Sequence, residues 1–418
     1  MIRSTTLPSG VRVLTETMPQ VRSATIGFWA DVGSAIELPA QRGISHLVEH
    51  MLFKGTPRRS ARAIAEAMDG VGGNLNAFTD KELTCFYAQV MDRHVPLAVD
   101  VIGDLFVHSL FDPEELRKEQ AVVLEEIRMY DDAPEDVIHD RFARTMWGGA
   151  ALGEPTIGYA ETVSALRSED LRAWMSQRYA PQTVIVTAAG NLEHDAFVGL
   201  VGDAFADYRG SAPPPPQESP RVVPTVDVLT RDTEQAYVMV GTPGLSLRDE
   251  DRYALAVLDT VLGGGMSSRL FQEVREKRGL AYSIYSFQQS YRAAGLFGVY
   301  AGCAPERAQE CIDVIAAELD AALGGVSDAE IALAREHLKG NLLLALESTS
   351  SRMMRLARNE VVYGRQIGTQ EVESAIDAVD GKAASRVAGA LLRPEGRGLC
   401  VLGPLSADRI RFGPSRAA

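Results

Sequence analysis

Two histidines and a glutamate stand together near the start of the chain, in the order His46-x-x-Glu49-His50. On a helix, at about 100° per residue, the three side chains share one face within an arc of about 100°. Two imidazoles one turn apart can bind a single zinc ion, and a glutamate beside them can take a proton from water at the metal. This H-x-x-E-H order, the reverse of the commoner H-E-x-x-H, predicts a zinc site. The alternative is a solvated helix face that carries these residues by chance, so a third ligand is needed.

A second helix, expected over residues 113–130, offers that ligand. Asp112 is typical of a helix cap, and the Pro-Glu-Glu that follows suits a first turn. Glu119 and Glu126 lie within one broad apolar arc of this helix, whereas Glu125 points away. Carboxylates on an apolar stripe are costly to bury unless a metal or a charged partner meets them. We therefore assign Glu126 as the third ligand and Glu119 as an acid that orients a ligand histidine; the alternative is a helix with partly exposed acids at its edge.

The complete set resembles the inverted zinc motif of the pitrilysin and mitochondrial processing peptidase family. The segment from Glu119 to Glu126 is also similar to that family's distal-glutamate helix. The resemblance covers nearly the whole chain. It implies one Zn²⁺ per chain on His46, His50 and Glu126, with Glu49 as general base and Glu119 as supporting acid.

Composition bounds the class of protein. A chain of 418 residues is too long for one ordinary core and should form two domains. No apolar run approaches the roughly 20 residues that a membrane span needs, so we expect a soluble protein with no membrane partner. The net charge of −14 argues against nucleic-acid binding and fits attraction of basic ligands, although many acidic surfaces serve only solubility.

Location follows from two further observations. The N-terminal residues show no apolar signal core and no arginine-rich transit segment, which favours a prokaryotic cytoplasm or a mature form already trimmed. The four cysteines are scattered without a C-x-x-C pair, so free buried thiols are expected.

The remaining histidines are expected at the surface or at helix caps rather than on a metal: His94, His108, His139, His194 and His337.

A proline-rich stretch divides the chain into two related halves. We predict an N-terminal zinc-binding domain at 1–210, a linker at 211–224 and a homologous C-terminal domain at 225–418. The strand at 235–241 matches a strand beginning at Ser23, and a helix near 250–262 matches the zinc helix without its histidines. Further helical regions are expected at about 305–323, 327–363 and 370–391.

The predicted fold class is α+β. It has two homologous domains, each a mostly antiparallel sheet covered by helices, and together they enclose a chamber that admits only flexible peptides. This arrangement follows mainly from the resemblance, while the residues themselves support the mixture of strands and helices and the repeat.

A hairpin at residues 74–90 is expected to carry the substrate. Its first strand is short, lightly apolar and flanked by glycines, so it suits a sheet edge, and an open edge can bind an extended peptide through backbone hydrogen bonds. In the resembled family the corresponding Asn-Ala-Phe strand binds peptide in this way, which nominates Asn76, Ala77 and Phe78. The alternative is a polar edge strand without a ligand.

Two acids follow the break at Pro134. Asp136 and Asp140 lie at i and i+4 on one helix face and would repel each other unless a cation is near. In the resembled processing peptidases, acids at matching offsets recognise an arginine near the cut. This implies a preference for basic residues near the scissile bond, against the alternative of a capped, solvated helix start.

The second half offers one more pair of reactive residues. The glycine-rich segment at 263–269 lacks the G-K-[ST] ending of a phosphate loop, so we reject nucleotide binding. In the resembled family an arginine and a tyrosine seven positions apart reach toward the zinc, and Arg275 and Tyr282 match that spacing. Arg278 is a rival with the wrong spacing. A guanidinium and a phenol could stabilise the oxyanion of the reacting carbonyl.

These residues predict a zinc metalloendopeptidase that hydrolyses flexible peptides or unfolded segments, with a homodimer as the expected assembly. The alternative is a non-catalytic scaffold or partner subunit of a processing-peptidase-like complex. Such subunits usually lose metal residues, and this chain keeps the whole set. The choice between processing peptidase and general oligopeptidase stays open.

Overall fold

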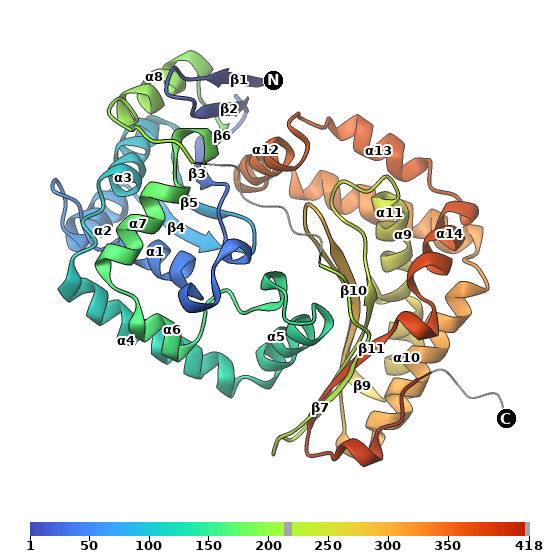
Figure 1. Ribbon diagram of the computed structural model, residues 1–418. Helices are drawn as coiled ribbons and strands as arrows, with labels where there is room; N and C mark the ends of the chain where they lie inside the picture. The colour runs from blue at the N-terminus through green and yellow to red at the C-terminus, as the bar shows by residue number, and fades with distance from the viewer. Residues whose placement is uncertain (213–219, 414–418) are drawn as a thin grey trace. The chain divides into compact units, whose positions relative to one another are not determined.

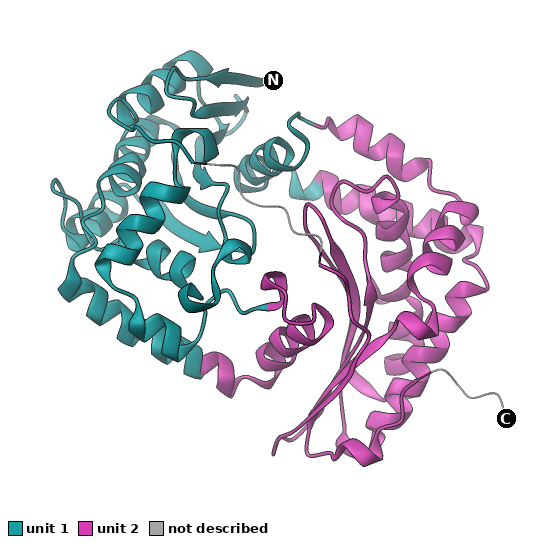
Figure 2. Ribbon diagram, in the orientation of Figure 1, with its two compact units in different colours: residues 1–128, 154–216, 344–366 teal, residues 129–153, 217–343, 367–418 magenta. Residues whose placement is uncertain are grey.

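The computed structural model describes residues 1–212 and 220–413, so the linker predicted at 211–224 lies partly outside the described residues (Figure 1). The chain forms two compact units (Figure 2). The first contains residues 1–128, 154–216 and 344–366, and the second contains residues 129–153, 217–343 and 367–418.

The first unit is built on a six-stranded sheet in the order β1-β2-β6-β3-β5-β4. Its strands are β1 (Ile2–Thr6), β2 (Arg12–Thr17), β3 (Ser23–Ala30), β4 (Asn74–Thr79), β5 (Thr84–Met91) and β6 (Val184–Gly190). Strands β2 and β6 are parallel, and all other neighbours are antiparallel. The predicted hairpin is therefore confirmed as β4 and β5, and β4 is an edge strand.

Helices cover one face of this sheet. They are α1 (Ile44–Leu52), α2 (Ala61–Asp69), α3 (Val95–His108), α4 (Pro113–Asp132), α6 (Ala160–Ala165), α7 (Ser168–Arg178) and α8 (His194–Ala204). Alternation along β3 sends Ile26 and Phe28 into the core beneath α3. Rings of Phe28 and Phe205 stack at 5.6 Å. Each such buried side chain stabilises the fold by about 1.5–3 kcal/mol relative to its exposure.

The second unit repeats this architecture. Its strands β7 (Val226–Thr230), β8 (Ala236–Pro243), β9 (Ala281–Ser290), β10 (Gly295–Cys303) and β11 (Gly398–Gly403) are ordered β7-β11-β8-β10-β9. Its helices are α5 (Pro134–Met146), α9 (Arg252–Gly263), α10 (Ala308–Leu323), α11 (Asp328–Ala345), α13 (Thr369–Asp377) and α14 (Gly381–Leu391). Strands β7 and β11 are parallel like β2 and β6. Apart from the added β1, the strand order matches the first sheet, which confirms the predicted repeat.

One helix from each half of the chain packs on the other half's sheet. Helix α12 (Thr349–Tyr363) lies on β2, β3 and β6, where Met353 joins Leu14 and Trp29 in a second apolar cluster. Gly27 permits this approach, because a Cβ there would lie 2.5 Å from the Met353 sulfur. In the second unit α5 packs on β8 and β11.

The predicted domain limits are therefore corrected at two places. Residues 129–153 belong with the second unit and residues 344–366 with the first, although they precede and follow the linker respectively. Side-chain patterns show that α5 and α12 are amphipathic, but they do not specify which sheet each helix covers.

Two helical regions are also interrupted where one continuous region was expected. The region at 327–363 breaks before α12, because the Ser348 side chain accepts a hydrogen bond from the backbone N–H of Ser351 and caps a new helix. Asp380 caps α14 in the same way and divides 370–391. The four cysteines are free and buried, as predicted.

Among the described residues no single helix is long and apolar enough to cross a bilayer. The helical segments Asp92–His108 and Pro113–Asp132 together meet the criteria of length and composition, but they are bent by 101° against each other.

Candidate metal centre

Helix α1 presents the histidines and Glu49 opposite a fully buried face. Ile44, Leu47, Val48, Met51 and Leu52 all lie in the core. His46, Glu49 and His50 are partly exposed on the other side. The helical period predicted from the sequence is confirmed, and burial of five apolar side chains fixes which way the other face points.

The first turn of α1 is held by an acid that lies shortly before it in the chain, Glu37. Gly43 precedes the helix with a φ of 91°, a left-handed conformation that favours glycine. The two carboxylate oxygens of Glu37 accept hydrogen bonds from the backbone N–H groups of Gly43 and Ser45, both at 2.8 Å. Burial raises the pKa of Glu37 to about 7, although both backbone donors act against that shift.

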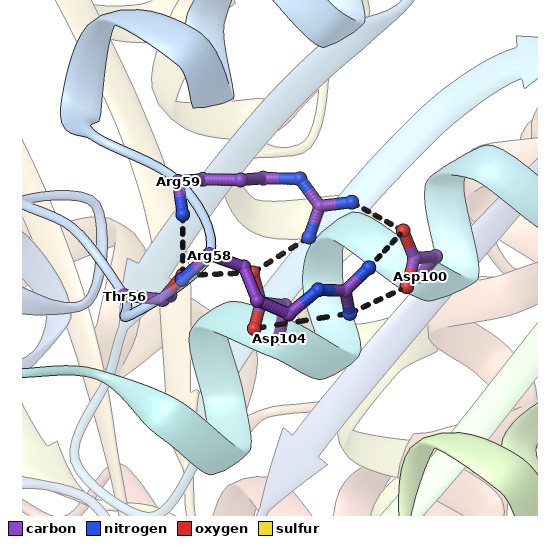
Figure 3. Close-up of polar contacts among 5 residues, drawn as sticks. All are labelled: Thr56, Arg58, Arg59, Asp100 and Asp104. Carbon is purple, nitrogen blue, oxygen red and sulfur yellow. Dashed lines mark hydrogen bonds and ion pairs between the residues drawn. The ribbon is translucent and has the colours of Figure 1, made fainter.

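The segment after α1 is tied to α3 by a charged cluster (Figure 3). The Thr56 hydroxyl and the Arg59 guanidinium donate to the same oxygen of Asp104, at 2.8 and 2.6 Å. Arg58 donates twice to Asp100, at 2.9 and 3.2 Å, and Arg59 also reaches Asp100. The Asp104 side chain is fully buried, so its charge depends on these partners. The cluster therefore holds the segment that follows α1 against α3.

Three candidate ligand atoms converge between α1 and α4. The ligand atoms of His46, His50 and Glu126 all lie within 4.8 Å of one another. Glu126 Oε2 is 3.9 Å from His46 Nε2 and 3.7 Å from His50 Nε2. Zinc bonds of about 2.0–2.2 Å in a tetrahedron place donor atoms about 3.4 Å apart, so these separations suit one zinc ion.

Two atoms at this place lack partners in the part of the chain that the structure describes. Glu126 Oε2 and His46 Nδ1 are buried without a hydrogen bond. A buried carboxylate oxygen without a donor is costly unless a cation meets it. Burial, with a smaller contribution from the charge of His50, lowers the pKa of His46 to about 4. The His46 imidazole is therefore neutral near pH 7, as a metal ligand must be.

Glu119 lies within hydrogen-bond distance of the second histidine. Its Oε2 lies 3.1 Å from His50 Nδ1, which leaves His50 Nε2 toward Glu126. Its Oε1 lies 2.5 Å from the ammonium of Lys54. Burial of Leu116, Glu119 and Val123 confirms that this acid lies on the inner face of α4. Val122 and Tyr130, which the helical period places in the same broad arc, are exposed, so the apolar stripe is narrower than expected. Sequence reasoning did not identify Lys54.

Glu49 is bonded to the edge strand. The Thr79 hydroxyl at the end of β4 donates to Glu49 Oε2 at 2.5 Å. Burial raises the pKa of Glu49, and the Thr79 hydrogen bond opposes that shift. The base nominated from the sequence is thus beside the strand nominated for substrate. Thr79 was not identified from the sequence, because its partner is distant along the chain.

The nominated peptide-binding residues lie on β4. Asn76 is exposed, its side-chain oxygen accepts from the backbone N–H of Ala77 at 2.8 Å, and Phe78 packs edge-on against Trp29 at 5.7 Å. All of β4 pairs with β5 on one side, and no strand among the described residues pairs on the other. An available edge is what strand addition requires; peptide binding there stays a prediction.

The other nominated residues belong to the second unit. The Arg275 guanidinium lies 4.9 Å from the centre of the Tyr282 ring, and Tyr282 is 79% exposed. Arg278 instead forms an ion pair with Glu273. Asp136 and Asp140 are both exposed, one turn apart on α5. Arg275 and Tyr282 are therefore partners in space, and their approach to a substrate carbonyl stays a prediction.

Among the other histidines, His194 departs most from the expected surface or capping position. His194 is buried, and its two ring nitrogens bond the hydroxyls of Thr5 and Thr15, both at 2.8 Å. It therefore joins α8 to the sheet. Among the described residues, His46, His50 and Glu126 form the one group of three histidine, cysteine or acidic side chains close enough to share a metal ion.

Comparison with known proteins places these observations in a family. A family model described as "Insulinase (Peptidase family M16)" matches residues 12–159, and one described as "Peptidase M16 inactive domain" matches residues 165–338. A protein of Streptomyces coelicolor named as an uncharacterized zinc protease is 46% identical, with 97% of this chain and 90% of that protein covered. A probable mitochondrial-processing peptidase subunit beta of Arabidopsis thaliana is 34% identical, covering 96% of this chain and 78% of the relative.

Solved structures agree on the fold. The crystal structure of a protease from Helicobacter pylori has a TM-score of 0.91 at 22% identity, covering 97% of this chain and 99% of that one. The peptidase M16 inactive domain from Pseudomonas fluorescens also has a TM-score of 0.91, at 17% identity, covering 99% of this chain and 100% of that one. With relatives above 30% identity over nearly its whole length, this chain belongs to peptidase family M16.

Proposed function

We propose that this chain is a zinc metallopeptidase that hydrolyses peptide bonds in flexible peptides or unfolded segments. The observation that carries the proposal is the convergence of His46, His50 and Glu126 within 4.8 Å, with Glu49 beside them on the same helix. The zinc proteases among its relatives support the same reaction class.

Each residue of the site has a separate role that follows from its position. His46, His50 and Glu126 would hold Zn²⁺, which when bound supplies a positive charge that polarises a carbonyl oxygen and makes water more acidic. Glu49 takes a proton from water as general base and can pass it to the leaving amine. The Thr79 hydroxyl fixes one Glu49 oxygen, so the other can face water. Glu119 keeps the His50 ring in orientation.

The substrate would lie as an added strand on β4. Backbone hydrogen bonds to the free edge at Asn76, Ala77 and Phe78 give affinity without demanding one sequence. We propose that Arg275 and Tyr282 stabilise the oxyanion of the tetrahedral intermediate. Their support is the family resemblance together with the contact between them.

The alternative is a non-catalytic scaffold or partner subunit. Glu49 distinguishes the two, because a scaffold has no need of an acid beside the ligand set. Glu49→Gln should keep zinc and lose turnover of an unstructured peptide, whereas Glu125→Gln, an exposed acid on α4, should behave like the parent. Degradation by Glu49→Gln at the parental rate would contradict the proposal.

We further propose a preference for basic residues near the cut, through Asp136 and Asp140 on α5. Two exposed carboxylates one turn apart suit a guanidinium. The double variant Asp136→Asn, Asp140→Asn should lower the ratio of cleavage rates for arginine-rich over arginine-free peptides. An unchanged ratio would remove this part of the proposal. We also propose that the chain forms a homodimer and is cytoplasmic, as predicted from the sequence. Light scattering would test the homodimer.

A further inference from the structure

Lys54 stands one turn beyond His50, just after the end of α1. Its backbone N–H bonds the carbonyl of Met51 at 3.1 Å, so the residue still follows the helical path. Its ammonium lies 2.5 Å from Glu119 Oε1, and His50 Nδ1 lies 3.1 Å from Glu119 Oε2. One carboxylate from α4 is thus held by two side chains from the same end of α1, with one partner for each oxygen.

We infer that Lys54 is a positioning residue for the metal centre, acting through Glu119 on His50. The inference rests on the proposed zinc site. Glu119 is only 8% exposed, so water does little to hold its carboxylate in place or to screen its charge. Lys54 supplies the compensating charge and also fixes the rotation of the carboxylate group.

The orientation of His50 follows from that rotation. With Glu119 accepting at Nδ1, the ring carries its proton there and turns the lone pair of Nε2 toward Glu126, 3.7 Å away. Without Lys54, one oxygen of Glu119 loses its partner and the carboxylate can turn away from the ring. His50 Nε2 would then also occupy positions from which it cannot bind the same metal ion as His46 and Glu126.

His46 cannot compensate for this loss. Its Nδ1 has no hydrogen-bond partner within the described part of the chain, so no hydrogen bond at that nitrogen orients its ring. Among the described side chains, the contacts from Lys54 to Glu119 and from Glu119 to His50 therefore supply the hydrogen-bonded support for this pair of imidazoles. A change in Lys54 should accordingly appear in zinc affinity, even though Lys54 does not touch the metal.

The experiment measures zinc affinity on the full chain by competition with a chromophoric chelator. The variants are Lys54→Met, Lys54→Gln, Lys54→Arg and the control Lys118→Met. Lys118 also lies against an acid of α4, Glu115, but it is 67% exposed and adjoins no nominated ligand. Lys54→Met and Lys54→Gln should weaken zinc binding about 10-fold, near the lower end for residues that support a ligand, while Lys54→Arg stays within about 3-fold. Lys118→Met should match the parent.

A double variant shows whether Lys54 acts through Glu119. Glu119→Gln alone should weaken zinc binding about 10- to 100-fold, and adding Lys54→Met should weaken it no further. Losses that multiply in the double variant would overturn the inference, as would Lys54 variants that bind zinc like Lys118→Met. A parent that binds no zinc would overturn the proposed function as well, so the two failures are distinguishable.

Discussion

Glu37 should make the stability of the protein fall between mildly acidic and neutral pH. Its two oxygens hold the first turn of α1 at 2.8 Å each, and its pKa is raised from 4.5 to about 7 by burial. A raised carboxyl pKa means that the folded state binds more protons than the unfolded state between these values. The contribution to the free energy of unfolding is therefore most favourable below pH 4.5 and decreases as pH rises to about 7.

The size of the effect follows from the shift. A difference of about 2.5 pKa units at about 1.36 kcal/mol each corresponds to about 3 kcal/mol. Glu37→Gln removes this titration but keeps the side-chain size and one oxygen acceptor. Relative to the parent, the variant should therefore gain about 3 kcal/mol in free energy of unfolding between pH 4.5 and pH 7.5, whichever protein is more stable at the start.

The assay is urea unfolding of zinc-free protein at both pH values, followed by circular dichroism. Zinc is removed so that metal binding does not add its own pH dependence. Glu114→Gln is the matched control, because Glu114 is 80% exposed on α4. A difference in free energy of unfolding between Glu37→Gln and the parent that stays constant across the two pH values, as for the control, would refute the raised pKa of buried Glu37.

Two further substitutions test other contacts of the site. Thr79→Val should lower kcat about 10-fold with KM little changed, because it removes the hydroxyl that holds the base Glu49. Thr79→Ser, which keeps a hydroxyl, should recover most of the rate. A Thr79→Val variant as fast as the parent would contradict this role of Thr79. Asp104→Asn should lower the free energy of unfolding by about 3 kcal/mol, because it leaves Arg59 without its buried partner (Figure 3). In urea titrations Asp100→Asn, at a more exposed acid, should cost less, and equal losses would count against the burial argument.

The zinc helix and the acid helix were predictable because their information is local. Helical spacing alone places His46 and His50 on one face of α1, and burial of Glu119 follows from its position on the apolar stripe of α4. The strand order of the two sheets could be anticipated only as a repeat, since pairing depends on contacts between distant segments.

The supporting contacts were not predictable for the same reason. Lys54 and Thr79 meet partners that are distant along the chain. Glu37 lies only six residues before Gly43, but it bonds the helix start through irregular backbone, and none of the three residues carries a recognisable motif. The exchange of α5 and α12 between the two sheets likewise leaves no mark in the sequence, because an amphipathic pattern identifies a buried face without naming the surface that covers it.

Crystallography of zinc-loaded protein, with data collected on both sides of the zinc absorption edge, tests the proposed metal site most directly. We predict one anomalous peak per chain, at bonding distance from His46 Nε2, His50 Nε2 and a carboxylate oxygen of Glu126. A zinc ion bound elsewhere, or a peak with Glu126 turned away from the two imidazoles, would contradict it.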